Sequence, residues 1–126
     1  MLQFSLKKLM GSFRAAAVGL GQTVRTEQNM RLHLAAMVGI VILGLWLDFE
    51  VLEWLLVVVC VVSVIGMELM NTAVEYLCNV VRDRLKLDYA ATKFPRDMAA
   101  AAVLIVAIGA AVVGLVIIVP KVVALF

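Results

Sequence analysis

Three long apolar segments dominate the pattern of hydrophobic and polar positions along the chain. Residues 98–120 contain no charged side chain, and a helix of that length crosses a bilayer core of about 30 Å. The apolar stretch from Leu34 to Leu47 is shorter, so we expect its helix to begin near Asn29. These two segments predict membrane spans at about residues 29–47 and 97–120.

The apolar segment between these two spans differs from them because polar residues continue it. Trp54 to Met67 is too short to cross a bilayer alone. It reaches spanning length only if its helix continues through Glu68 and Glu75. We therefore predict a span at about residues 53–79 that carries carboxylates at one end.

Ahead of the first span, apolar residues recur at steps of three and four and fall on one narrow helical face. Basic residues occupy the other sides. We expect this segment, about residues 2–25, to form an amphipathic helix in the membrane surface. The alternative is an ordinary helix packed on the bundle. The apolar face consists of Leu2, Leu6, Leu9, Phe13, Ala17, Leu20 and Val24.

Composition supports a membrane protein. Hydrophobic residues make up 65% of the 126 residues and the mean hydropathy is +1.10, whereas soluble domains are roughly 45–50% apolar. The fold class predicted for residues 1–126 is a single all-α integral membrane domain, with three transmembrane helices and the surface helix. We expect it to contact bilayer lipids and to bind no nucleic acid.

The placement of charge predicts the orientation in the membrane. Lys and Arg accumulate in cytoplasmic loops, and here they precede the first span or separate the second from the third. The turn from Asp48 to Glu53 carries acids and no base. The prediction is a cytoplasmic N-terminus and an external C-terminus. The basic residues in question are Lys7, Lys8, Arg14, Arg25, Arg31, Arg82, Arg84, Lys86, Lys93 and Arg96.

Polar residues of the second span share one helical face, because they follow one another at steps of three, four, seven and eleven. An ionisable residue inside a membrane costs at least ~2.5 kcal/mol on insertion scales, so such a stripe indicates a functional site. The alternative is a polar seam that holds helices together. The stripe comprises Glu68, Asn71, Thr72, Glu75 and Asn79.

Depth separates the two carboxylates of this stripe. Glu75 lies about 10 Å nearer the cytoplasm than Glu68, so we expect Glu75 to bind a cation and the desolvated Glu68 to act as a general base. Glu27 at the mouth of the first span could join Glu75 in a magnesium site. Alternatively, Glu27 is a solvated acid or an i,i+4 partner of Arg31.

Arg96 and Asp97 open the third span, where the arginine could contact phosphate oxygens and the aspartate could cap the helix. A membrane anchor is the other interpretation of Arg96. The chain contains no G-x-x-x-x-G-K-[ST] loop. Any use of ATP therefore proceeds without a soluble-kinase fold.

Four motifs resemble the bacterial membrane-integral diacylglycerol kinase and undecaprenol kinase family over nearly the whole chain. They are S-F-R-A-A-A-V-G-L from Ser12, T-E-Q-N-M-R-L-H-L from Thr26, E-L-M-N-T-A-V-E from Glu68 and R-D-M-A-A-A-A-V-L from Arg96. The third is the most specific of the four. The form of the second resembles the Gram-positive undecaprenol kinase branch.

The resemblance implies a homotrimer in the bacterial inner membrane, with active sites between subunits and magnesium-ATP as the phosphate donor. The lipid alcohol would be undecaprenol or diacylglycerol. Matching positions make Glu68 the base, and Glu27 and Glu75 the magnesium ligands. Arg96, Asp97 and Asn79 would lie at the nucleotide, with Asn71, Thr72 and Arg31 in supporting positions.

The chain departs from the family pattern at two places. The family usually has Asp where this chain has Asn79, and Lys-Asp where it has Arg96-Asp97. The loop before Arg96 is also a few residues longer and contains Pro95. Two alternatives to an active kinase stay open: a kinase-like membrane scaffold without turnover, and a small proton-coupled transporter.

Overall fold

The computed structural model describes residues 5–126, which form helices joined by short connections. In chain order the elements are α1 (Leu6–Thr26), α2 (Gln28–Trp46), α3 (Val51–Leu85), the short 3₁₀ helix η1 (Tyr89–Thr92) and α4 (Lys93–Val123). No strand occurs within this described range. Leu2, assigned above to the surface helix, lies outside it.

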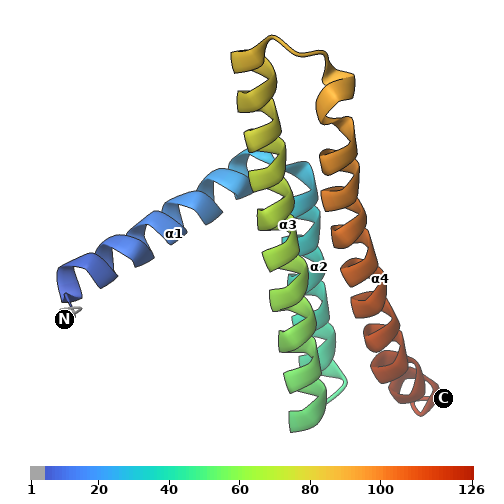
Figure 1. Ribbon diagram of the computed structural model, residues 1–126. Coiled ribbons are helices and arrows are strands. Elements are labelled where there is room, and N and C mark those ends of the chain that lie inside the picture. The colour runs from blue at the N-terminus through green and yellow to red at the C-terminus, as the bar shows by residue number, and fades with distance from the viewer. Residues whose placement is uncertain (1–4) are drawn as a thin grey trace.

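Helices α2, α3 and α4 run alongside one another, whereas α1 projects obliquely away from them (Figure 1). Helix α3 is the central element, because it packs against both α2 and α4. Helix α1 contacts α2 and α3, and its buried residue is Thr23 in the last turns. The junction between α1 and α2 therefore meets the flank of α3.

Local sequence explains where these helices begin and end. Ser5 accepts a hydrogen bond from the backbone N–H of Lys8 at 3.4 Å and so caps α1. The side chain of Glu53 accepts one from the backbone N–H of Glu50 at 2.7 Å, which satisfies an unpaired donor at the start of α3. Lys86 ends α3 in the left-handed conformation, with φ of 52°.

Two of these helices extend further than the predicted spans. Helix α3 continues to Leu85 rather than stopping near residue 79, and α4 begins at Lys93 rather than near residue 97. Water solvates charged side chains at helix ends, so they need not end a helix that emerges from the bilayer. Pro95 lies in the first turn of α4, where its missing N–H removes no intrahelical hydrogen bond.

An apolar core closes the end of the bundle that is remote from η1. Its buried members are Leu47, Phe49, Val57 and Ile117. Lys121 holds the same end by pairing with Glu53 at 3.0 Å. Gly44 also belongs to this packing, because a Cβ placed there would lie 2.7 Å from the Trp54 ring and 2.9 Å from Phe49. Glycine thus lets the two aromatic rings approach α2.

The apolar surfaces of α2, α3 and α4 face outward. All three helices are long and apolar enough to cross a membrane, yet only 11–17% of the residues in their apolar windows are buried within one chain. Such surfaces need lipid or another protein chain as neighbours. The predicted all-helical membrane fold with three spans is confirmed. The surface position of α1 and the homotrimer stay predictions.

Substituting alanine for Gly44 will destabilise the bundle by roughly 1–3 kcal/mol, because the added methyl group overlaps the Trp54 and Phe49 rings. Thermal unfolding in detergent micelles measures the effect. Gly39→Ala is the matched control, since a Cβ at Gly39 on the same helix meets nothing within 4 Å. Equal stability of the two variants would contradict this account of the packing.

Candidate functional site

The polar stripe on α3 begins deep in the bundle and becomes more accessible toward η1. Glu68 is only 1% exposed and Asn71 is 7% exposed. Thr72, Glu75 and Asn79 are partly buried. The two predicted carboxylates therefore differ in burial as well as in depth. Glu68 is a carboxylate enclosed by protein, which is rare for an ionisable residue unless it has a partner or a function.

Hydrogen bonds satisfy part of this stripe and leave part of it unsatisfied. Asn71 donates from Nδ2 to Glu75 Oε1 at 3.1 Å, and the Thr72 hydroxyl donates to the Glu68 carbonyl at 3.0 Å. Within residues 5–126, neither Glu68 Oε2 nor Asn71 Oδ1 has a hydrogen-bond partner, although both atoms are buried. Buried oxygens normally accept a hydrogen bond. The stripe thus presents two acceptors to a donor from outside the chain.

Glu27 reaches the stripe from the junction between α1 and α2. It occupies the N-cap position of α2, but its side chain makes no capping hydrogen bond. Together with Gln22 and Thr26, it lines a hollow that Thr72 and Tyr76 of α3 complete. Thr72 lies one helical turn after Glu68 and one residue after Asn71 on α3. The fold therefore brings Glu27, which is distant in sequence, to the helix that carries Glu68 and Glu75.

The carboxylates of Glu27 and Glu75 are not neutralised by basic side chains. The ion pairs found between residues 5 and 126 involve neither of them. Glu75 uses one oxygen to accept from Asn71. No group of three metal-ligating side chains occurs within the described residues. Two carboxylates do fit Mg²⁺, which commonly takes one or two together with substrate phosphates and water.

Arg31 stabilises the junction that presents Glu27. Its Nη1 donates to the carbonyl of Arg25 at 3.0 Å and to that of Val24 at 3.4 Å. These carbonyls lie at the C-terminal end of α1, where they have no intrahelical partner. Arg31 forms no ion pair with Glu27 within the described chain, so the alternative interpretation of Glu27 as its i,i+4 partner is wrong.

Arg96 lies against the other end of the stripe. It is 9% exposed, and its Nη2 donates to Asn79 Oδ1 at 2.9 Å. The two positions that depart from the family pattern are thus in direct contact. Asp97 does not share this contact: it is exposed and forms an ion pair with Lys93.

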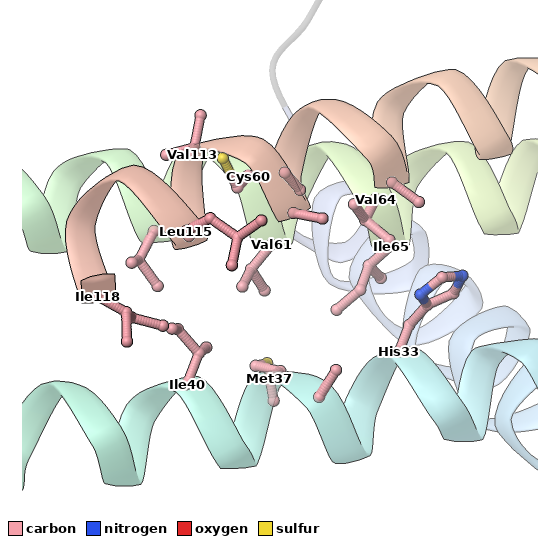
Figure 2. Close-up of a pocket in the computed structure, with 16 residues that line it drawn as sticks. His33, Met37, Ile40, Cys60, Val61, Val64, Ile65, Val113, Leu115 and Ile118 are labelled. Atoms are coloured by element: carbon pink, nitrogen blue, oxygen red, sulfur yellow. The ribbon is translucent and has the colours of Figure 1, made fainter. Parts of the chain in front are cut away.

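An apolar cavity of about 450 Å³ extends from the stripe toward the opposite end of the bundle. Side chains of α2, α3 and α4 line it, and His33 projects from α2 at one end (Figure 2). The remaining lining residues are apolar, among them Met37, Ile40, Val61 and Val64. Val64 and Ile65 line the cavity at the same end as His33 (Figure 2) and precede Glu68 by about one turn on α3, so the polar end of the cavity is the end nearer the buried carboxylate.

Sequence reasoning missed three of these residues. His33 was not among the predicted site residues, because a single histidine on an apolar helix carries no periodic signal. Tyr89 and Thr92 surround Arg96 from η1, but a loop sequence does not reveal what its side chains approach. The one available signal was the position of both residues just ahead of Arg96.

Comparison with known proteins identifies the class of protein. A family model described as prokaryotic diacylglycerol kinase matches residues 14–118. An undecaprenol kinase of Bacillus subtilis (strain 168) is 31% identical over 116 residues, which are 92% of this chain and 92% of that protein. A diacylglycerol kinase of Synechocystis sp. is 31% identical over 106 residues, 84% of this chain but 59% of that longer protein. No solved structure gives a significant match.

These matches, on a three-span helical fold, define a membrane-integral lipid kinase. The chain belongs to the prokaryotic diacylglycerol kinase family. The resemblance inferred from the four sequence motifs is thereby confirmed.

Removing the Arg31 side chain will loosen the junction between α1 and α2, because two carbonyls at the end of α1 lose their donor. In Arg31→Ala, hydrogen exchange followed by mass spectrometry will be several-fold faster in the peptide that contains Glu27. Arg14→Ala is the control, since Arg14 is an exposed arginine on α1 that lies away from the junction. Unchanged exchange in Arg31→Ala would refute the role of this side chain.

Proposed function

We propose that the protein transfers the γ-phosphoryl group of ATP to the hydroxyl of a membrane lipid alcohol, either undecaprenol or diacylglycerol, with Mg²⁺ bound at the site. The observation that carries the proposal is the Glu68 side chain, which is 1% exposed and whose Oε2 has no hydrogen-bond partner among residues 5–126. A lipid hydroxyl is the donor that this oxygen lacks.

Glu68 acts as the general base in this proposal. The lipid oxygen attacks the γ-phosphorus and forms a new P–O bond, while its proton passes to Glu68. The bond between the γ-phosphorus and the bridging oxygen breaks, and ADP leaves with that electron pair. Enclosure of Glu68 supports this role, because it keeps water away from the oxygen that would meet the lipid hydroxyl.

Glu27 and Glu75 are the proposed magnesium ligands. Bound there, Mg²⁺ would neutralise charge on the nucleotide phosphates. Asn71 holds Glu75 in place through its hydrogen bond at 3.1 Å, and Thr72 lies in the hollow beside Glu27. Hard carboxylate oxygens without a protein counter-charge support this donor set.

The nucleotide phosphates are proposed to lie between this pair of carboxylates and the start of α4. Arg96 would donate to phosphate oxygens, with Asn79 beside it and Asp97 at the edge of the same end of the bundle. Phosphoryl transfer depends chiefly on positioning and charge neutralisation, and Arg96 supplies a buried positive charge for this purpose.

The apolar cavity is the proposed place of the lipid's hydrocarbon chain. Its His33 end includes Val64 and Ile65, one turn before Glu68 on α3, which would direct the hydroxyl to the base and the chain along α2 and α4. Generic apolar contacts do not distinguish a polyprenyl chain from acyl chains. Both lipids are therefore arms of the assay described below.

Membrane position and assembly complete the proposal. Basic residues gather near Glu75 and Arg96, at the end joined by η1, which supports a cytoplasmic active site where ATP is available. We propose a cytoplasmic N-terminus, an external C-terminus and residence in the bacterial inner membrane. Unburied apolar faces on all three spans support a homotrimer, with α1 in the membrane surface.

Glu68→Gln will lower the rate of lipid phosphorylation by about 10²–10⁴-fold, because the amide cannot accept the hydroxyl proton. Purified protein in mixed micelles is incubated with labelled ATP and either undecaprenol or diacylglycerol, and labelled lipid is counted. Glu53→Gln makes the same change at the other end of α3 and should retain activity. Wild-type protein that labels neither lipid would favour the scaffold alternative, and unimpaired Glu68→Gln would exclude the proposed base.

Glu75→Gln and Glu27→Gln will each raise the Mg²⁺ concentration needed for half-maximal activity by at least about tenfold. Loss of one carboxylate removes a hard oxygen ligand from the proposed set. Activity measured across a magnesium titration at fixed ATP reports the shift. Glu50→Gln, an exposed acid at the remote end of the bundle, controls for net charge. A lower maximal rate with the same magnesium midpoint would argue against metal binding at these residues.

A further inference from the structure

Arg96 is a buried cation that has no acidic partner among residues 5–126. Its residue surface is 9% exposed, and the ion pairs formed within residues 5–126 are Arg82–Asp83, Lys93–Asp97 and Lys121–Glu53. A buried charge is ordinarily paired, because removing it from water is costly. The charge of Arg96 is therefore available to an anion from outside the chain.

Three neutral groups surround the guanidinium on different sides. Asn79 Oδ1 accepts from Nη2 at 2.9 Å and Thr92 Oγ1 accepts from Nε at 3.4 Å. The Tyr89 ring lies 5.1 Å from the guanidinium carbon, within the range of a cation–π contact. Since arginine has donors only, both polar neighbours must present an acceptor.

The Thr92 hydroxyl is itself oriented for this task. It donates its proton to the carbonyl of Tyr89 at 3.3 Å, which leaves its lone pairs for Nε of Arg96. Thr92 is 5% exposed, so the arrangement is protected from water. The turn of η1 thus supplies both a ring and an acceptor to the first turn of the next helix.

We propose that Tyr89, Thr92 and Asn79 are positioning residues that hold Arg96 in place without neutralising it, so that Nη1 is directed to a phosphate oxygen of the bound nucleotide. Within the described chain, Nη1 has no acceptor. The inference rests on the proposed function, in which the nucleotide lies at this end of the bundle.

Neutrality distinguishes this arrangement from an ordinary salt bridge. A carboxylate at position 79 would hold the guanidinium equally firmly but would cancel the charge that attracts phosphate. An amide oxygen and an aromatic face hold it and leave the charge intact. A side chain held in its binding geometry also loses less conformational entropy when the ligand arrives.

The position of Asn79 supports the same conclusion. Asn79 follows Glu75 by four residues on α3, a rise of about 6 Å along the helix. A phosphate chain that contacts Arg96 at one end can therefore approach the proposed magnesium ligand at the other. The separation suits a polyphosphate better than a single small anion.

Steady-state kinetics at saturating lipid and varied magnesium-ATP tests the proposal. Tyr89→Leu and Thr92→Val will raise the KM for ATP roughly 3- to 10-fold, because each removes one contact to Arg96, while the KM for lipid alcohol stays unchanged. Tyr89→Phe keeps the ring and Thr92→Ser keeps the hydroxyl, and both restore the KM. Phe94→Leu, a change at an exposed aromatic residue in the first turn of α4, is the matched control.

The Asn79→Asp variant distinguishes the position of the Arg96 side chain from its uncompensated positive charge. The new carboxylate will pair with Arg96, so thermal unfolding in micelles will occur at the same or a higher temperature while the KM for ATP rises. A purely structural contact would leave the KM unchanged in this variant. That outcome overturns the proposal. So does a result in which Arg96→Ala raises the KM for ATP but Tyr89→Leu and Thr92→Val keep the wild-type KM.

Direct binding of magnesium-ATP, measured by calorimetry, distinguishes failure of this inference from failure of the proposed function. Wild-type protein that binds ATP but labels no lipid contradicts the kinase proposal, and the positioning of Arg96 is then judged by the Kd of the same variants. A raised Kd in Tyr89→Leu, restored in Tyr89→Phe, supports the inference. A Kd equal to that of wild type in every variant overturns it.

Discussion

Hydrocarbon offers no hydrogen-bond partner to a polar side chain, and the arrangement of α3 depends on this constraint. The helix carries a carboxylate at Glu68 that water does not reach. Its polar neighbours follow on the same face toward the aqueous end, where Asn71 binds Glu75 and Asn79 binds Arg96. Because these polar groups are confined to one stripe, they either form hydrogen bonds with one another or remain open to a substrate. The remaining faces of α3 can therefore be apolar.

Groups from distant parts of the chain meet this stripe because of two short connections. The break between α1 and α2 places Glu27 beside Thr72, and Arg31 stabilises that break from the first turns of α2. The turn of η1 lets α4 return along α3, which places Arg96 beside Asn79. The candidate site thus depends as much on how helices are joined as on the helices themselves.

Periodicity and burial cost were enough to predict part of this structure from sequence. The three spans follow from the lengths of the apolar segments. The common face of Glu68, Asn71 and Glu75 follows from their spacing, since an α-helix fixes which positions coincide. Helices α3 and α4 continue beyond the predicted spans, because charged residues that flank an apolar segment can remain helical. Helix periodicity carries no information about a turn, so the contacts of Tyr89 and Thr92 with Arg96 were not predictable. The hydrogen bonds that Arg31 donates were not predicted either, because the carbonyls that accept them belong to the preceding helix.

The contact between Asn79 and Arg96 has a consequence for how this family is compared across species. The pattern that the sequence motifs resemble has aspartate and lysine at these two positions, which sum to zero charge. Asparagine and arginine in this chain sum to one positive charge. A change at either position alone alters the charge felt by its neighbour. The two positions are therefore expected to diverge as a pair.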